Sequence, residues 1–167
     1  MLPREAIEFI LESVEPGAVV VEFGSGHGSE ILAKHCELYS VEHDEAWLGI
    51  TSSTYIHATI QQNIHSTASG ESGWYDVEKV KKNWPYEPQC VVIDGPPGFI
   101  GRTGILSLLE LLERVPVILV DDVDRPAELQ LAEHLAERLN FVVQTCDVEK
   151  PREGGTQRRY AVLERRG

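Results

Sequence analysis

Glycines and small polar residues follow the first strongly apolar stretch of the chain, in the run Val19–Ser29. Three valines form a continuous apolar segment, as a buried parallel strand requires, and Gly24, Gly26 and Gly28 come next. Beyond Ser29 the apolar residues recur at helical spacing. A glycine turn between a strand and a helix lets the backbone approach a ligand, and the helix N-terminus offers free N–H groups. The run therefore predicts a nucleotide-binding turn, although a tight turn without a ligand has the same outline.

Acidic residues end three further predicted strands. Glu42 ends the second strand, Asp94 follows the fourth, and Asp121 and Asp122 follow the fifth. Ligands of open α/β sheets bind outside the carboxyl ends of the strands, so we expect these acids at one site. Glu42 suits hydrogen bonds to ribose hydroxyls, each contributing about 1.5–3 kcal/mol. Asp94 or Asp122 is placed to take a proton from a substrate hydroxyl. Capping of loops and helices is the structural alternative for each acid.

The segment after Asp94 supplies candidates for substrate binding. Pro96 and Pro97 stiffen the turn that follows Gly95. Arg102 opens the next predicted helix, and we expect it at the rim of the pocket. There it either binds a substrate carboxylate in a bidentate manner or pairs with local acids.

These residues require a sheet of parallel strands with helices between them. Strand and helix patterns alternate along the chain, and two alternating segments joined by a turn-rich stretch end it. The sequence predicts one α/β domain over residues 1–167, with a Rossmann-like, doubly wound, mostly parallel seven-stranded sheet closed by an antiparallel C-terminal hairpin. The Gly/Ser-rich stretch Ser66–Trp74 is predicted to be a mobile surface loop, either a lid or a plain connection. The predicted strands are Val19–Phe23, Glu37–Glu42, Thr54–Ile60, Cys90–Ile93, Val115–Val120, Phe141–Val148 and Gln157–Leu163, and the predicted helices include Pro3–Val14, Tyr75–Trp84, Gly101–Leu112 and Pro126–Leu139.

Taken together, E-F-G-S-G-H-G from position 22, the acid at 42, D-G-P-P-G from position 94 and the closing hairpin resemble class I S-adenosylmethionine (SAM) methyltransferases. The likeness covers nearly the whole chain. It implies methyl transfer from SAM to a substrate oxygen, and it places Trp47 either beside the adenine or in the core. The cofactor-binding residues that it implies are Glu22, Gly24, Ser25, Gly26, Gly28, Glu42, His43, Asp94 and Gly95.

Two other functions are weaker interpretations of the same motifs. A nucleotide-dependent oxidoreductase would carry the dinucleotide fingerprint G-x-G-x-x-G, but Ser29 stands where its last glycine is needed. The closing hairpin also disfavours that class. A catalytically inactive methyltransferase-fold binding subunit is the second alternative, and the intact acids Glu22, Glu42 and Asp94 argue against it.

Two narrower resemblances concern the acceptor and a metal. From Tyr75 to Glu128 the chain resembles the plant glucuronoxylan/polysaccharide methyltransferase family, which implies a small acid or a sugar as acceptor, with Arg102 and Pro96 as substrate-binding residues. Asp94, Asp121 and Asp122 stand where catechol-type O-methyltransferases carry metal-binding acids. That likeness implies Mg²⁺, which prefers hard oxygen ligands.

Composition limits the kinds of partner and the cell compartment that we expect for the protein. The formal net charge of −12 disfavours a nucleic-acid partner, because phosphate binding relies on clustered basic residues. Two basic groups, Lys79–Lys82 and the arginines at 158, 159, 165 and 166, are expected to be solvated surface. Three widely spaced cysteines and no apolar run of membrane-spanning length favour a reduced, cytoplasmic protein without a membrane partner. We expect a small-molecule or sugar substrate, and a homodimer is left open.

Overall fold

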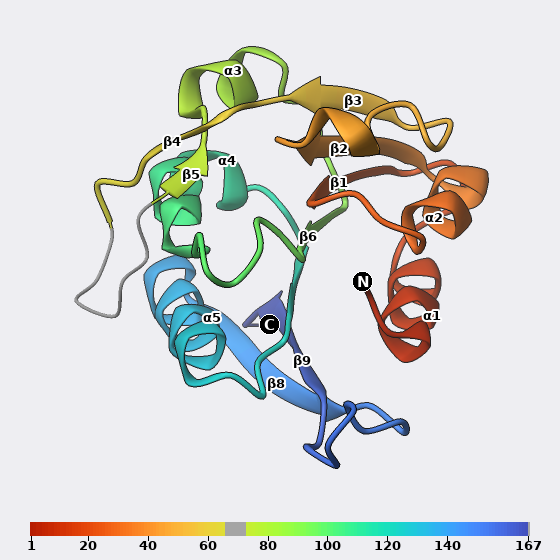
Figure 1. Cartoon of the computed structure of the whole chain (residues 1–167), viewed down its shortest axis with the longest axis vertical. Coiled ribbons are helices and arrows are strands. Elements are labelled where there is room, and N and C mark those ends of the chain that lie inside the picture. Colours follow the sequence, from red (N-terminus) through yellow and green to blue (C-terminus); the bar gives the residue numbers. More distant parts are fainter. Residues whose placement is uncertain (66–72, 167) are drawn as a thin grey trace.

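The fold is a seven-stranded sheet between two layers of helices (Figure 1). The computed structural model describes residues 1–65 and 73–166. Five neighbouring strands pair in parallel and the last two pair antiparallel, which confirms the predicted doubly wound sheet with its closing hairpin. In spatial order the strands are β3 (Thr54–His57), β2 (Glu37–Glu42), β1 (Val19–Phe23), β6 (Cys90–Ile93), β7 (Val117–Asp121), β9 (Arg159–Arg165) and β8 (Phe141–Asp147).

Successive residues of the central strands face two separate cores. Val20 and Val92 pack with the helices α1 (Arg4–Ser13) and α2 (Ser29–His35), whereas Val21 and Val91 face the opposite side of the sheet. That second core also contains side chains of α3 (Val77–Lys82), α4 (Leu109–Leu112) and α5 (Pro126–Leu139). Burying each such aliphatic side chain stabilises the fold by about 1.5–3 kcal/mol. The continuous apolar runs seen in the sequence therefore reflect strands that are covered on both faces.

Local sequence signals set the ends of several helices. Pro126 occupies the first turn of α5, and Asn140 ends that helix with a left-handed φ of +56°. The helix predicted over Gly101–Leu112 is instead a 3₁₀ helix, Thr103–Leu108, followed by the single turn of α4. Trp47 also lies in a 3₁₀ turn, Glu45–Trp47.

The prediction of a single strand over Thr54–Ile60 is wrong. β3 ends at His57, and a separate two-stranded antiparallel sheet forms from β4 (Ile60–Gln62) and β5 (Gly73–Tyr75). Trp74 and Tyr75 are buried in β5, where their rings lie 5.3 and 5.8 Å from that of Phe23. This aromatic packing explains why the end of the Gly/Ser-rich stretch is a strand.

The rest of that stretch, residues 66–72, lies outside the described residues, so its prediction as a lid stays a prediction. α3 begins two residues later than expected. Asp76 caps it by accepting a hydrogen bond of 3.0 Å from the Lys79 amide. Across the two described ranges, no helix is long and apolar enough to span a membrane.

Candidate functional site

A pocket of about 900 Å³ lies at the carboxyl ends of β1, β2, β6 and β7, where the topology of the sheet favours ligand binding. It has two chemically different sides. We call one the glycine side, which is formed by Gly24, Ser25, Glu42, His43 and Gly95. The other is the arginine side, formed by Asp94, Pro96, Phe99, Arg102, Asp122, Arg125 and Glu128.

On the glycine side, two turns touch through their backbones. Gly24 has a φ of +90°, which side chains rarely tolerate, and a Cβ there would lie 2.9 Å from the Gly95 Cα. A Cβ at Gly95 would in turn lie 2.8 Å from the Gly24 Cα. By contrast, Gly26 and Gly28 line separate hollows of the surface. The packing therefore requires glycine at the first position of the motif and at the turn after β6.

Glu42 joins the end of β2 to the glycine turn. One oxygen of its carboxylate accepts a hydrogen bond of 2.9 Å from the Ser25 amide. The other accepts bonds of 2.7 and 2.8 Å from the amides of His43 and Asp44. The carboxylate is buried and clamps the turn, and because it also belongs to the pocket wall it can accept hydrogen bonds from a ligand. Trp47, for which the sequence predicts either a contact with adenine or a place in the core, also lines this wall.

Glu22 lies beneath the glycine turn and is 1% exposed. The Ser40 hydroxyl donates a hydrogen bond of 2.6 Å to it. Burial raises the pKa of Glu22 to about 7, although hydrogen bonds from Ser29 and Ser40 act in the opposite direction. Its position makes it a support of the turn rather than a surface of the pocket.

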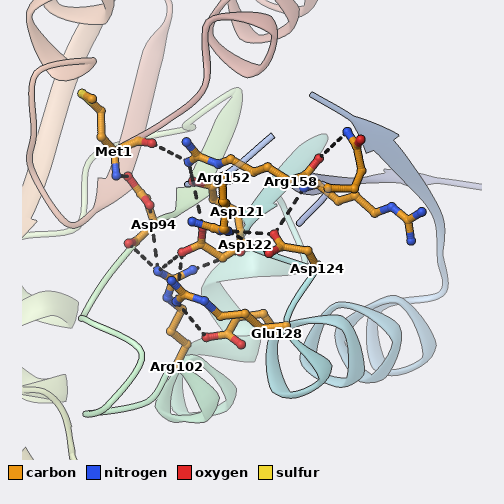
Figure 2. Close-up of polar contacts among 12 residues, drawn as sticks. Met1, Asp94, Arg102, Asp121, Asp122, Asp124, Glu128, Arg152 and Arg158 are labelled. Carbon is orange, nitrogen blue, oxygen red and sulfur yellow. Dashed lines mark hydrogen bonds and ion pairs between the residues drawn. The ribbon is translucent and has the colours of Figure 1, made fainter. Parts of the chain in front are cut away.

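On the arginine side, carboxylates converge in the way the sequence predicted. Oxygen atoms of Asp94, Asp121 and Asp122 lie within 4.8 Å of one another. Figure 2 shows Arg102 approaching this group from one direction, and Arg152 and Arg158 from another.

Each of these guanidinium groups binds a carboxylate. Asp122 pairs with Arg102 at 3.0 Å, with Arg125 at 3.2 Å and also with Arg152, while Arg158 pairs with Asp121 at 2.5 Å. Burial acts to raise the pKa of Asp122, but the guanidiniums of Arg102, Arg152 and Arg125 together hold it below its usual value. Burial raises the pKa of Asp121. Cationic groups thus offset the charge of Asp122, whereas at Asp121 burial and the carboxylates of Asp94 and Asp122 outweigh the effect of Arg158.

The donor set does not fit a divalent cation. Mg²⁺ needs several carboxylate or water oxygens free to coordinate it. Here Asp121 and Asp122 are already bound by guanidinium groups, and a cation between them would meet that positive charge. The carboxylates expected to bind Mg²⁺ are therefore close together, but arginine side chains occupy the positions that the cation would need.

Arg102 lies deeper than the expected position at the pocket rim. It is 3% exposed and donates hydrogen bonds to the carbonyl oxygens of Pro96, Asp121 and Asp94, at 3.2, 3.0 and 2.7 Å. A fourth bond of 3.0 Å reaches Asp122. These bonds tie the end of β6 to the end of β7, so the guanidinium fixes the shape of the site.

Sequence reasoning missed three groups of the site. Arg158 was expected on solvated surface, but it reaches back to Asp121 with its side chain only 18% exposed. Arg152 pairs with Asp122 and Asp124 from the turn between β8 and β9. Glu128, in the first turn of α5, is buried in the pocket wall. Arg152 and Arg158 gave no local signal, because their partners are distant in the sequence.

Comparisons with known proteins give structural neighbours only, since no family model and no curated protein matches the chain. The likeness to the glucuronoxylan family is therefore not supported. An rRNA methylase from Streptococcus thermophilus is 16% identical, with 100% of this chain and 99% of that chain covered and a TM-score of 0.61. An O-methyltransferase from Bacillus cereus, in complex with S-adenosylhomocysteine, is 12% identical, with 99% and 83% covered and a TM-score of 0.64.

A third solved structure, SMU.1697c from Streptococcus mutans, also contains S-adenosylhomocysteine. It is 10% identical, with 98% of this chain and 99% of that chain covered and a TM-score of 0.62. Identities this low establish architecture and not substrate. The chain has the fold of class I SAM-dependent methyltransferases.

Proposed function

We propose that the protein binds SAM and transfers its methyl group to an oxygen of a substrate. The observation that carries the proposal is the glycine side of the pocket. There Gly24 and Gly95 pack backbone against backbone at two strand ends, and together with Glu42 they line the pocket. Glu42 would hold the ribose hydroxyls, and Trp47 the adenine. The cofactor supplies the reactive methyl group when bound.

The arginine side is the proposed acceptor side. Its residues align an acceptor oxygen, and such positioning can contribute up to about 7–11 kcal/mol to catalysis. Of the two predicted bases, Asp94 is the better candidate. Its nearest guanidinium nitrogen, on Arg102, is 3.9 Å away, whereas Asp122 is bound closely by three arginines. The amino group of Met1 lies 3.4 Å from the other Asp94 oxygen. A metal is not part of the proposed mechanism.

We infer a small-molecule hydroxyl as acceptor. Among the solved neighbours, several are named as RNA methyltransferases and one is an O-methyltransferase, so the fold is compatible with either kind of acceptor. The net charge of −12 favours the small molecule, because long-range repulsion opposes a polyanion. An acidic acceptor would meet Arg125, whose side chain is 43% exposed at the pocket wall, rather than the buried Arg102.

Calorimetry with S-adenosylhomocysteine tests the cofactor. The wild-type protein should bind it, and Glu42→Ala should weaken the affinity tenfold or more, because charge-assisted hydrogen bonds to the ligand are lost. Glu37→Ala is the matched control, since Glu37 is exposed at the other end of β2. Binding of NAD but not of S-adenosylhomocysteine would refute the proposal. Methylation of RNA, and not of hydroxyl-bearing small molecules, by the active protein would refute the inferred acceptor class.

A further inference from the structure

The hydroxyl of Tyr75 is a buried polar group without a partner. Tyr75 is 1% exposed, and among the residues that the structure describes its hydroxyl has no hydrogen-bond partner. Buried hydroxyls are almost always paired, because leaving one unpaired costs free energy. Tyr75 also belongs to the wall of the 900 Å³ pocket. An unpaired group in a pocket wall points to a ligand as the missing partner.

The hydroxyl lies where the two glycine turns meet. A Cβ at Gly95 would be 2.6 Å from the Tyr75 hydroxyl oxygen, and Gly95 itself touches Gly24. The residues proposed to bind adenosine, Glu42 and Trp47, belong instead to the end of β2 and the turn after it. The hydroxyl is therefore placed over the ends of β1 and β6, beside the part of the pocket left for the rest of the cofactor.

Aromatic packing holds the ring in place. The ring of Tyr75 lies 5.1 Å from Trp74, 5.8 Å from Phe23 and 6.0 Å from His43. Contacts of this kind fix the ring without engaging its oxygen. A preorganised donor costs little entropy when a ligand binds.

The surroundings decide which kind of group the hydroxyl binds. Burial raises the pKa of Tyr75 well above its usual value, and the nearby carboxylate of Glu42 adds to this effect. The hydroxyl thus stays protonated and can donate. The carboxylates of the wall accept hydrogen bonds and cannot bind an anionic ligand group, whereas a phenol hydroxyl can.

We propose that the Tyr75 hydroxyl donates a hydrogen bond to the carboxylate of the amino-acid end of the cofactor. This inference rests on the proposed function, since it concerns the same cofactor. It makes Tyr75 a positioning residue, because holding the amino-acid end orients the sulfur and its methyl group toward the arginine side.

Calorimetry of Tyr75→Phe with two ligands tests the inference. S-adenosylhomocysteine carries the amino-acid end, whereas 5′-methylthioadenosine shares the adenosine and sulfur but lacks that end. We expect Tyr75→Phe to weaken S-adenosylhomocysteine about tenfold and to leave 5′-methylthioadenosine unchanged. Tyr39→Phe is the matched control, because the Tyr39 hydroxyl bonds to Glu37 outside the pocket.

Thermal unfolding separates this role from a structural one. The ligand-free Tyr75→Phe variant should melt at the same temperature as the wild type or higher, because it loses an unpaired group. A lower melting temperature with unchanged affinity for S-adenosylhomocysteine would overturn the inference, as would equal weakening of both ligands. Wild-type protein that binds neither ligand would overturn the proposed function as well, so the two failures are distinguishable.

Discussion

On the glycine side of the pocket, backbone contacts and amide hydrogen bonds hold the wall together, whereas on the arginine side buried ion pairs do so. Gly24 and Gly95 touch directly, and Glu42 accepts hydrogen bonds from the backbone amides of Ser25 and His43. Across the pocket, Arg102 and Arg152 bind Asp122 from distant parts of the chain. One wall therefore depends on shape and the other on the balance of charge.

The difference predicts which kind of substitution destabilises each wall. Removing one partner of a buried ion pair leaves an uncompensated charge, which costs more than the pair itself contributed. Adding a methyl group where two backbones touch forces them apart. The arginine side should therefore be sensitive to loss of charge, and the glycine side to added volume.

Arg102→Met should have the largest effect on stability. It removes four hydrogen bonds from a buried guanidinium and leaves Asp122 without its most buried counter-ion. We expect the free energy of unfolding to fall by about 3–5 kcal/mol, measured by urea denaturation. Arg125→Met is the matched control, because its half-exposed side chain also pairs with Asp122 but should cost less than about 1 kcal/mol. Similar losses of unfolding free energy for both variants would mean that burial of the guanidinium does not determine how much each ion pair contributes.

Gly24→Ala tests the glycine side in the same assay. The left-handed φ costs a side chain roughly 1–2 kcal/mol, and the collision with Gly95 adds about 1–3 kcal/mol. We expect a loss of about 3 kcal/mol, together with loss of binding of S-adenosylhomocysteine. At Gly26 a Cβ would meet no heavy atom of the described chain within 4 Å, so Gly26→Ala should leave stability nearly unchanged. Equal effects at the two glycines would contradict the backbone contact.

The two sides also differ in how far they could be predicted from the sequence. The mostly parallel sheet and its closing hairpin follow from local patterns of apolar residues and turns, and the places of Gly24, Glu42 and Asp94 at strand ends follow from glycines and acids. Arg158 could not be assigned, because a basic residue near a chain end has the same pattern whether it is solvated or paired with Asp121.

The same limit explains the errors in the fold. β5 lies at the end of a Gly/Ser-rich stretch, and its pairing with β4 and its packing against Phe23 make it a strand. The segment after Gly101 is a 3₁₀ helix in which Trp74 packs directly on Gly104. A Cβ at Gly104 would lie 2.1 Å from the Trp74 Cγ. Contacts between residues distant in the sequence decide both outcomes.

Glu22→Gln should change how stability depends on pH. Burial raises the pKa of Glu22 from 4.5 to about 7 in the folded protein, so the folded state holds a proton that the unfolded state has released between these values. This contribution is fully present below pH 4.5 and is lost as the pH rises through 7. At pH 8 the variant should be more stable than the wild type by up to about 3 kcal/mol, and at low pH the two should converge.

Urea denaturation at several pH values between 4.5 and 8 would measure this difference, and Glu12→Gln, at an exposed position of α1, is the control. Parallel profiles for Glu22→Gln and the wild type would show that the carboxylate is solvated in the folded protein.

The smallest effect is expected from metal ions. Because guanidinium groups already bind Asp121 and Asp122, Mn²⁺ added to the wild-type protein should stay free in an electron paramagnetic resonance titration. EDTA should likewise leave the affinity for S-adenosylhomocysteine unchanged. The double variant Arg152→Gln/Arg158→Gln should gain Mn²⁺ binding, because it frees Asp121 and the Asp122 oxygen that Arg152 binds, while Arg102 and Arg125 stay paired with the other Asp122 oxygen. Arg159→Gln, which removes an exposed pair with Asp147, should not gain it. Stoichiometric Mn²⁺ binding by the wild type would mean that a divalent cation displaces the arginines from the carboxylates, and that the arginine side is a metal site.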